Sequence, residues 1–366
     1  MTEELRCAVA LSYLTGVGPI RARRLLARTG SYREAVAADD ALLRALKIPR
    51  AAIAQLRDGS ALRHADDELA FVERHGVRVV DCLAEDYPRR LADRVDAPLV
   101  LFYRGGASLD PPRTVGIVGT RTPTAAGRLF CEQLVGELGE YGVTVISGLA
   151  YGIDVTAQRA CVRAARPTIA VVAHGLAEIY PAAHRDVARD MLAHGGLLTE
   201  YPSGLRSRRE FFPQRNRIIA AMSDALVVVE SAARGGSMIT ANLAAGYGTP
   251  VFAVPGRPRD PQSVGCNLLV KSHRAGLLDS AADLGYALGW TAGDDGAPTA
   301  RANLLFQTFA PAEQDVVDKL QRGEDLDLDE LLVGLGVSSG ELAGTLLELE
   351  FKGVVKSLPG KRYALV

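Results

Sequence analysis

The pattern that most restricts the fold is a repeated alternation of short apolar runs with amphipathic segments between Arg113 and Val254. Apolar strands that alternate with helices are typical of a parallel sheet covered by helices on both faces. We therefore predict a Rossmann-like, doubly wound α/β domain. Its predicted strands are Thr114–Val118, Val143–Ser147, Thr168–Ala173, Ala225–Glu230 and Pro250–Val254, and two of its predicted helices are Ala125–Tyr141 and Ile153–Ala164.

Residues 1–65 have a different pattern and predict a helical domain. The segments Leu5–Leu14 and Ile20–Leu26 carry apolar residues at helical spacing, and a glycine-rich turn with a proline joins them. This resembles a helix-hairpin-helix (SAM-like) domain, whose backbone N–H groups can bind a DNA phosphate. Gly16, Gly18 and Arg21 are therefore candidates for a secondary DNA contact, and a purely structural helical hairpin is the alternative.

Residues 66–290 form the predicted central domain, which begins with a helix (Asp66–His75) and a strand (Val77–Val80). Residues 291–302 are small and polar, which predicts a linker. Residues 303–366 predict three helices and a hairpin, the composition of a winged helix-turn-helix domain. These helices are Pro311–Arg322, Leu326–Leu335 and Ser338–Phe351, and the hairpin strands are Val354–Ser357 and Arg362–Val366.

The length and the apolar pattern indicate the class of protein. A chain of 366 residues suits two or three domains. No apolar run reaches the ~18–20 residues of a membrane span, and the N-terminus lacks the basic start of a secretory signal, so we expect a cytoplasmic protein. The five cysteines are scattered and form no Cys/His cluster, so we expect neither disulfides nor a bound metal.

The net charge of −1 argues against a protein that is basic throughout, but opposite charges are segregated along the chain. The segment Arg206–Arg217 holds five arginines and one acid, Glu210. The segment Glu313–Glu330 holds eight acids and two basic residues. This distribution allows one local face that binds anions such as phosphates.

Three glycine-containing loops follow predicted strands, where the ligand of such a sheet binds. In the first, Gly119, Thr120 and Arg121 can bind a phosphate, unless Arg121 pairs with a surface carboxylate. In the second, Ser147 can donate to a phosphate and Gly148 allows close approach, whereas Asp154 more plausibly has a structural role. In the third, Gly235, Gly236 and Ser237 form an anion nest before a helix.

These loops lack the motifs of known nucleotide-dependent enzymes. The first loop is not GxGxxG, which disfavours a dinucleotide cofactor, and the third has no GK[ST], which disfavours ATP hydrolysis. His174 follows a predicted strand but has no nucleophile beside it in the sequence. We therefore predict a protein without catalytic activity and without a cofactor.

The segment Arg206–Arg217 combines arginines with Phe211 and Phe212 and precedes a predicted helix, Ile218–Met222. Arginines bind the phosphates of single-stranded nucleic acid while aromatic rings stack on its bases. One of the two phenylalanines is expected to lie in the core. The candidate ligands in this segment are Arg208, Arg209, Phe212, Arg215, Asn216 and Arg217.

Taken in order, the loops resemble the DprA (Smf) family of bacterial DNA-processing proteins. The resemblance extends from about Asp66 to Leu284, and five blocks carry it: VGIVGTRTPTAAG, SGLAYGID, TIAVVAHGLAEIYP, FFPQRNRIIAAMSDALVVVESAARGGSMITA and GTPVFAVPGRPRDPQSVGCNLLV. It implies a homodimer of Rossmann-like domains that binds single-stranded DNA in a basic pocket without sequence preference. It also implies protection of that DNA and its delivery to the recombinase RecA during natural transformation.

The resemblance also implies roles for individual residues. Arg121 is expected to bind phosphate beside Thr120 and Ser147. Arg209 and Phe212 stand where the family presents a basic residue and a stacking ring, and the small residues of Gly235–Ser237 match its phosphate loop. The sequence departs from the family at Gln158, where a histidine is expected, at His184–Arg185, where a lysine is common, and at Lys271–Ala275.

Two alternatives to a recombination mediator are open for this sequence. One is a nucleotide-processing enzyme related to phosphoribohydrolases, but Asn242 stands where those enzymes have a glutamate after the glycine-rich loop. The other is a nucleotide-sensing scaffold that binds mononucleotides as tightly as oligonucleotides.

The predicted recognition helix of the winged helix domain is acidic. It contains Glu341, Glu348 and Glu350, and Lys352 follows it. DNA phosphates would repel this helix. We therefore hypothesise that the domain binds protein, or packs within the dimer, and does not read duplex DNA.

Overall fold

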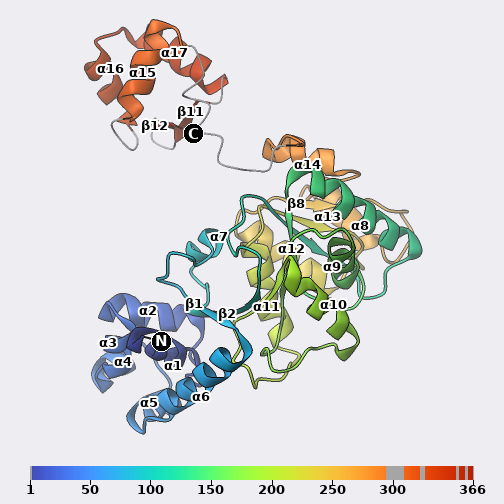
Figure 1. Ribbon diagram of the computed structural model, residues 1–366. Coiled ribbons are helices and arrows are strands. Elements are labelled where there is room, and N and C mark those ends of the chain that lie inside the picture. Colours follow the sequence, from blue (N-terminus) through green and yellow to red (C-terminus); the bar gives the residue numbers. More distant parts are fainter. Residues whose placement is uncertain (1, 294–308, 322–325, 352–353, 359–361, 366) are drawn as a thin grey trace. The chain divides into compact units, whose positions relative to one another are not determined.

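The computed structural model describes residues 2–293, 309–321, 326–351, 354–358 and 362–365 (Figure 1). It divides into two units, Met1–Asp295 and Gly296–Val366, which we describe separately. Residues 294–302 of the predicted linker, and residues 359–361 between the two predicted hairpin strands, lie outside the described residues.

A nine-stranded sheet organises the first unit, in the order β1-β2-β6-β5-β4-β3-β7-β8-β9. Strands β6 to β9 of this order run parallel, which confirms the Rossmann-like fold. The strands are β1 (Arg78–Asp81), β2 (Val100–Gly105), β3 (Thr114–Val118), β4 (Thr144–Ser147), β5 (Thr168–Val171), β6 (Gly196–Thr199), β7 (Ala225–Val228), β8 (Val251–Ala253) and β9 (Gly276–Leu277).

At one side the sheet departs from the parallel arrangement. Strand β2 pairs antiparallel with both β1 and β6. Strands β2, β6 and β9 are not among the strands predicted from the sequence. The last two have only four and two residues, too few to display a clear periodicity.

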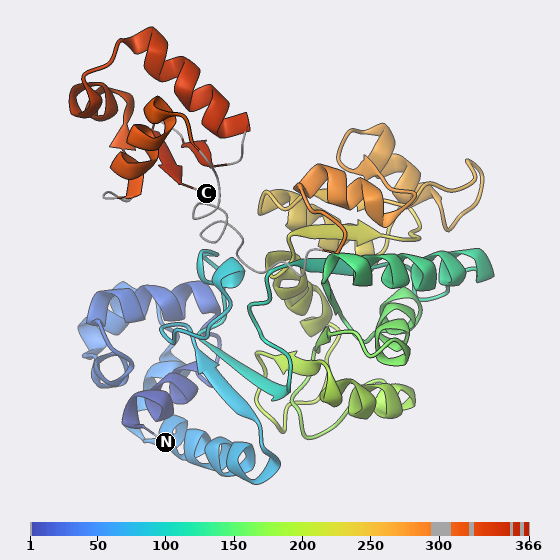
Figure 2. The same ribbon diagram turned by 45° about the horizontal axis from the view of Figure 1, so that its top comes forward.

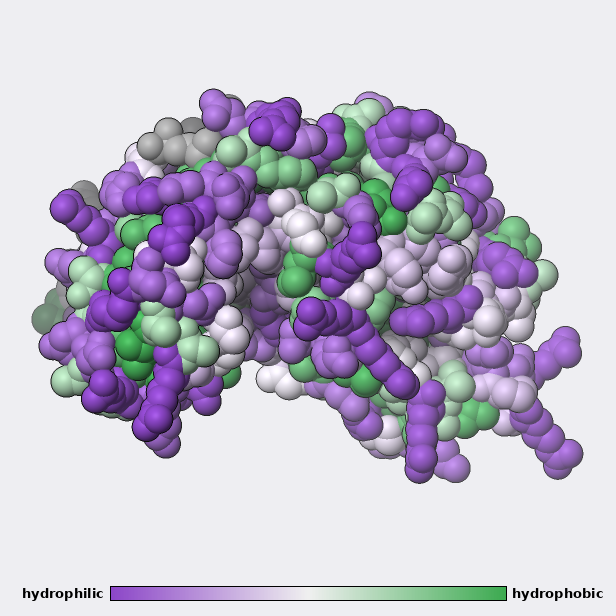
Figure 3. All heavy atoms as spheres, turned by 90° about the horizontal axis from the view of Figure 1, so that it is seen from below, coloured by the Kyte–Doolittle hydropathy of each residue, from purple (hydrophilic) through white to green (hydrophobic). Residues whose placement is uncertain are grey.

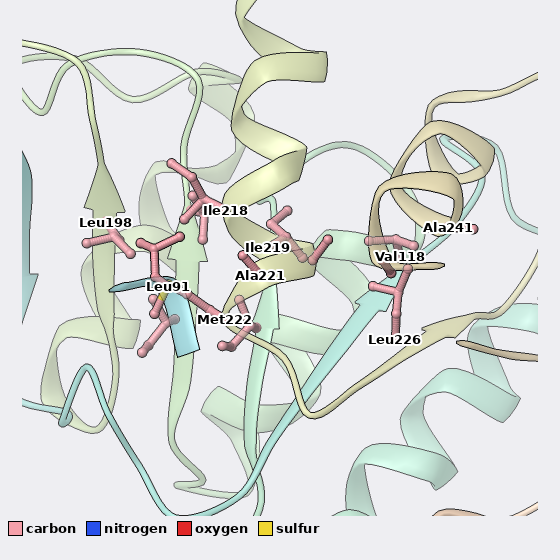
Figure 4. Close-up of a cluster of buried hydrophobic side chains, with 14 of the residues drawn as sticks. Leu91, Val118, Leu198, Ile218, Ile219, Ala221, Met222, Leu226 and Ala241 are labelled. Carbon is pink, nitrogen blue, oxygen red and sulfur yellow. The ribbon is translucent and has the colours of Figure 1, made fainter. Parts of the chain in front are cut away.

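Alternate residues of the central strands pack into different layers, as the two-residue period of a strand requires. Ile117 packs on one face, which is covered by α8 (Ala125–Leu138), α9 (Ile153–Arg163) and α14 (Ala281–Leu288). Val118 belongs to the cluster on the other face, where Ile219 and Ala241 lie beside it (Figure 4). The helices on this face are α7 (Arg89–Ala92), α11 (Phe211–Ala221), α12 (Gly236–Gly246) and α13 (Val264–Lys271).

Helices α1 to α6 share one core with the β1–β2 hairpin, and Figures 1 and 2 show them gathered beside these strands. Leu11 and Leu25 are buried in the same cluster as Val100 and Phe102 of β2. The boundary predicted between residues 65 and 66 falls within α6, which begins at Ser60 and not near Asp66. These helices are α1 (Glu3–Ser12), α2 (Pro19–Thr29), α3 (Tyr32–Ala37), α4 (Asp40–Ala45), α5 (Arg50–Arg57) and α6 (Ser60–His75).

The second unit is a winged helix domain, as predicted, with a three-stranded sheet in the order β10-β12-β11. One expected boundary was wrong, because Leu326–Asp327 is strand β10 and pairs with β12. The following helix begins at Leu328, where Asp327 caps it with Glu330. The elements are α15 (Pro311–Gln321), α16 (Leu328–Leu335), α17 (Ser339–Phe351), β11 (Val355–Leu358) and β12 (Arg362–Leu365).

The surface and the cysteines add two further observations. On the face drawn in Figure 3, hydrophilic side chains predominate and hydrophobic ones form small patches between them. No helix in the described part of the chain has the length and apolar character needed to cross a membrane. All five cysteines are unpaired.

Candidate functional site

A groove of about 900 Å³ opens at the carboxyl ends of the parallel strands. Strands β3 and β7 lie side by side there, and their following helices cover opposite faces of the sheet. This is the topological switch point, at which such sheets bind ligands. The groove brings together these candidates from three separate segments: Gly119, Thr120, Arg121, Arg208, Arg209, Phe212, Arg215, Asn216, Gly235, Gly236 and Ser237.

The loop after β3 is held in place by its backbone. The N–H of Thr120 donates to the carbonyl of Glu230 over 2.7 Å. A Cβ on Gly119 would lie 2.5 Å from the side chain of Ile153, so only glycine lets this loop pack on α9. The Glu230 carboxylate accepts from the N–H and the hydroxyl of Thr124, the residue that caps α8. These contacts fix the backbone that carries Arg121.

Arg121 is exposed, and no carboxylate among the described residues pairs with it. Its guanidinium carbon lies 5.4 Å from the ring centre of Phe212, within the range of a cation–π contact. Tyr180 contacts the same ring edge to face, with 6.0 Å between the ring centres. The groove therefore presents a charged group beside an aromatic surface that is already ordered.

Arg215 is buried behind Phe212 and does not extend into solvent. Its Nη1 donates to the carbonyls of Gly148 and Val171. Burial lowers the pKa of Arg215 to about 10, which leaves the guanidinium charged near neutral pH. Burial likewise raises the pKa of Asp154, whose carboxylate accepts from the N–H of Gly148 over 3.2 Å. Arg215 thus contributes charge from below the groove, and Asp154 has the structural role that we expected.

Two candidates from the sequence have side chains that are buried away from the groove. Ser147 is fully buried, and its hydroxyl donates to the carbonyl of Ile117 over 2.6 Å. Arg217 is buried and forms an ion pair with Glu200. Neither side chain can reach a phosphate in the groove, so we leave both out of the site. Gly148 lines a small adjoining pocket with Arg121, and its lack of a side chain makes room for Arg215 and Asp154.

The arginine-rich segment is partly helical, which the sequence analysis did not anticipate. Helix α11 begins at Phe211 and not at Ile218, and Pro213 lies in its first turn, where a missing N–H costs no hydrogen bond. Arg208 and Arg209 precede the helix and are exposed. Phe211 stacks on Tyr201 with 4.5 Å between the ring centres, whereas Phe212 lines the groove. Both rings are half-buried, so the expectation that one belongs to the core was too simple.

The third loop leads into the N-terminus of α12. Gly235 is the capping residue and supplies no side-chain hydrogen bond to the helix, so the first N–H groups of α12 remain open to an anion. The hydroxyl of Ser237 donates to that of Ser231 over 2.8 Å, which leaves the backbone as the main donor of this loop.

The structure gives His174 a structural contact. One ring nitrogen lies 2.8 Å from the carbonyl of Gly175, and the other accepts from the N–H of Tyr180 over 3.1 Å. Burial lowers the pKa of His174, which favours this neutral form. Asn242 accepts a hydrogen bond from Arg274. The described residues contain no group of histidine, cysteine or acidic side chains suited to a metal.

The hairpin candidates lie apart from the groove. Gly16 has a φ of +74°, and Arg21 donates to its carbonyl over 3.1 Å. Gly18 lines a separate cavity of about 490 Å³ with Glu200 and Tyr201. This location does not distinguish a hairpin that contacts DNA from a purely structural one, so a secondary DNA contact there stays a prediction.

The groove also contains residues that were not predicted from the sequence. Tyr180 and Arg234 line it without having been chosen as ligands. Arg234 immediately precedes the glycine pair, which could have identified it. No sequence signal marks Tyr180, because only the folded chain places the loop after β5 beside α11.

These features define a Rossmann-like protein with a basic, aromatic-lined groove at its switch point and a winged helix domain further along the chain. The family model described as DNA recombination-mediator protein A matches residues 78–289. A second model, the DprA winged helix domain, matches residues 297–361. The chain belongs to the DprA (Smf) family of DNA recombination mediators.

Three similar proteins support this assignment. A putative DNA processing protein DprA of Mycobacterium tuberculosis is 36% identical over 314 residues, which cover 81% of this chain and 79% of that protein. The crystal structure of DprA from Streptococcus pneumoniae has 29% identity and a TM-score of 0.65, and the match covers 78% of this chain and 97% of that one. DprA from Helicobacter pylori, whose structure is described as showing a single-stranded DNA binding mode, has 29% identity and a TM-score of 0.53, with 58% and 95% covered.

Proposed function

We propose that this protein binds single-stranded DNA in the groove without sequence preference. One observation carries the proposal: Arg121, Arg208 and Arg209 line the groove together with Phe212, and Asp154 supplies the only carboxylate among the described residues that line it. Guanidinium groups suit phosphates, and an aromatic ring that lines the groove suits stacking on an unpaired base. The Helicobacter pylori relative, described as binding single-stranded DNA, supports the same ligand.

Fluorescence anisotropy with labelled oligothymidylate and a duplex of matched length tests this function. We expect tighter binding of the single strand, with an affinity that falls as salt rises because bound phosphates release counterions. A mononucleotide should compete poorly, which separates this function from a nucleotide sensor. Equal affinity for single strand and duplex would overturn the proposal.

In the cell, the protein is proposed to protect incoming single strands and to load RecA onto them during natural transformation and recombination. The family assignment supports this role, and a cytoplasmic location shared with RecA is part of the proposal. Loading would appear as faster RecA filament formation on DNA already coated by a single-strand-binding protein. A RecA nucleation rate that this protein left unchanged would argue against the role.

The Rossmann-like domain is also proposed to form a homodimer. Strand β9 is an edge of the sheet, and Leu277 on it is 50% exposed. Leu268 on neighbouring α13 is 45% exposed. Exposed leucines at a sheet edge are typical of an interface. Sedimentation equilibrium measures the mass in solution, and a monomer at all concentrations would contradict the proposal.

Gly236→Ala is expected to weaken single-strand binding about tenfold, or ~1.4 kcal/mol, without harming the fold. A Cβ at this position would meet no protein atom within 4 Å, so the free protein has room for it. In the complex, a phosphate bound to the first N–H groups of α12 would leave no room for the added Cβ. Gly246→Ala, at the other end of α12 and equally free of contacts, is the matched control. Unchanged affinity of Gly236→Ala would show that no phosphate approaches this loop.

The winged helix domain is proposed to bind protein or to pack within the dimer. On α17, Glu341, Glu348 and Glu350 are exposed, and the described part of this helix carries no basic residue. We expect removal of residues 296–366 to change duplex affinity by less than about twofold, since an acidic helix gains nothing from phosphates. Anisotropy with labelled duplex measures this change. A large loss of duplex binding on truncation would overturn the hypothesis.

A further inference from the structure

A second hollow, of about 580 Å³, adjoins the groove on the other side of Arg121. We call it the α8–α9 hollow, and define it by Arg121, Arg128, Tyr151 and Arg159. Arg128 lies on α8 and Arg159 on α9, two helices in extensive contact. Arg121 lines both the groove and this hollow, so a ligand can pass from one to the other over its side chain.

The charge of the α8–α9 hollow is of one sign. Arg121, Arg128 and Arg159 are all exposed, and the described residues that line the hollow include no aspartate or glutamate. Nη1 of Arg128 donates to the carbonyl of Pro123 over 2.8 Å, which orients its guanidinium. Like charges that are held together without a compensating acid are unfavourable unless an anion binds between them.

The hollow also contains an aromatic surface. Tyr151 is 48% exposed, and its ring packs edge to face on His184 with 4.9 Å between the ring centres. His184 is itself buried, and its Nδ1 lies 2.8 Å from the carbonyl of Leu149. Tyr151 is therefore an exposed ring on a fixed support, which is the arrangement that stacks an unpaired base.

The path that leaves the groove in the other direction, away from the α8–α9 hollow, is less suitable for a phosphate backbone. It passes a cavity of about 340 Å³ lined by Arg185 and Arg206, but Arg206 is already paired with Glu178 at 3.6 Å. Beyond it, the cavity beside the α1–α2 hairpin has no basic side chain among its described lining residues, and Glu200 contributes to its wall. Electrostatics thus favours the α8–α9 hollow.

We propose that a single strand bound in the groove leaves it over Arg121 and continues along the α8–α9 hollow. Arg128 and Arg159 bind phosphates of this second segment, and Tyr151 stacks on one of its bases. The hollow thus lengthens the site, so that affinity continues to rise with oligonucleotide length after the groove is filled. This inference rests on the proposed binding of single-stranded DNA in the groove.

Anisotropy titrations with a series of oligothymidylates, from about 4 to about 16 nucleotides, test the inference in the full-length protein. Arg128→Ala/Arg159→Ala should weaken binding of the longest oligonucleotide about tenfold and leave the shortest unchanged. Its salt exponent on the longest should fall by about 1.4, at ~0.7 for each lost phosphate contact on single strands. Tyr151→Ala should lower affinity for long oligonucleotides only, and Tyr151→Phe should retain it.

The controls separate the two proposals. Arg159→Ala alone removes an exposed side chain and keeps the Arg128 hydrogen bond, so it guards against a folding defect. Arg74→Ala removes an equal charge from an exposed position on α6. If the wild type binds single strands but the variants lose the same affinity at every oligonucleotide length, or lose none at any length, the second segment alone is overturned. A wild type that binds no oligonucleotide would overturn the groove as well.

Discussion

Arg215→Met is expected to destabilise the first unit by about 3–5 kcal/mol, the usual cost of removing one partner from a buried pair of charges. Arg215 is 3% exposed, and its guanidinium donates to the carbonyls of Gly148 and Val171. Without it, these acceptors lose their donor and the buried carboxylate of Asp154 loses its counter-charge. Urea titration followed by circular dichroism measures the change in unfolding free energy.

The loss should depend on pH. Burial raises the pKa of Asp154, and removal of Arg215 raises it further. A carboxyl group whose pKa is higher in the folded than in the unfolded protein stabilises the fold fully only below its unfolded pKa of about 3.9. This stabilisation is lost as the pH rises through the folded-state pKa. The deficit of Arg215→Met should therefore be larger near pH 7 than near pH 5. Adding Asp154→Asn should recover part of it near pH 7.

The matched control for Arg215→Met is Arg234→Met, since Arg234 also lines the groove but is exposed. A surface substitution of this kind should change stability by less than about 0.5 kcal/mol. Wild-type stability of Arg215→Met would show that the buried charge is not needed to hold the loop after β4 against β5.

Arg121→Ala/Arg209→Ala is expected to weaken single-strand binding about a hundredfold, or ~2.8 kcal/mol. Each single variant should lose at least about tenfold, and two separate phosphate contacts should add. Both side chains are exposed and line the groove, so their removal leaves the packed core intact. The salt exponent for oligothymidylate should fall by about 1.4. Anisotropy titrations at several salt concentrations measure both quantities.

Arg74→Ala/Arg104→Ala removes the same charge from exposed positions on α6 and β2, outside the groove. It separates a local contact from a general effect of net charge, and should retain nearly wild-type affinity. Wild-type affinity in Arg121→Ala/Arg209→Ala would exclude this groove as the DNA site.

The sequence was sufficient to locate the groove because of how a parallel sheet is built. Each glycine loop follows an apolar run, and parallel strands place their carboxyl ends at one edge. Gly119–Arg121 and Gly235–Ser237 are more than a hundred residues apart, yet both line the same groove. The antiparallel pairing of β2 with β6 was not predictable in this way, because four residues of β6 carry too little pattern.

The burial of individual side chains could not be obtained from the sequence. Ser147 ends a buried strand, and the sequence alone does not show whether its hydroxyl faces the groove or the neighbouring strand β3. In the arginine-rich segment, the early start of α11 decides the outcome. Phe212, Arg215 and Asn216 are spaced at i, i+3 and i+4 on one helical face, and all three line the groove.

What the sequence by itself determined is therefore the α/β architecture, the winged helix domain, the family and the loops that form the groove, because periodicity and glycine position are local properties of the chain. Only the tertiary structure decided which arginines remain free. Arg217 follows Phe212 by five residues, which turns it to another side of α11, where it meets Glu200. Tyr180 and Arg159 gain their places beside Arg121 through packing between distant segments, and no local pattern records such contacts.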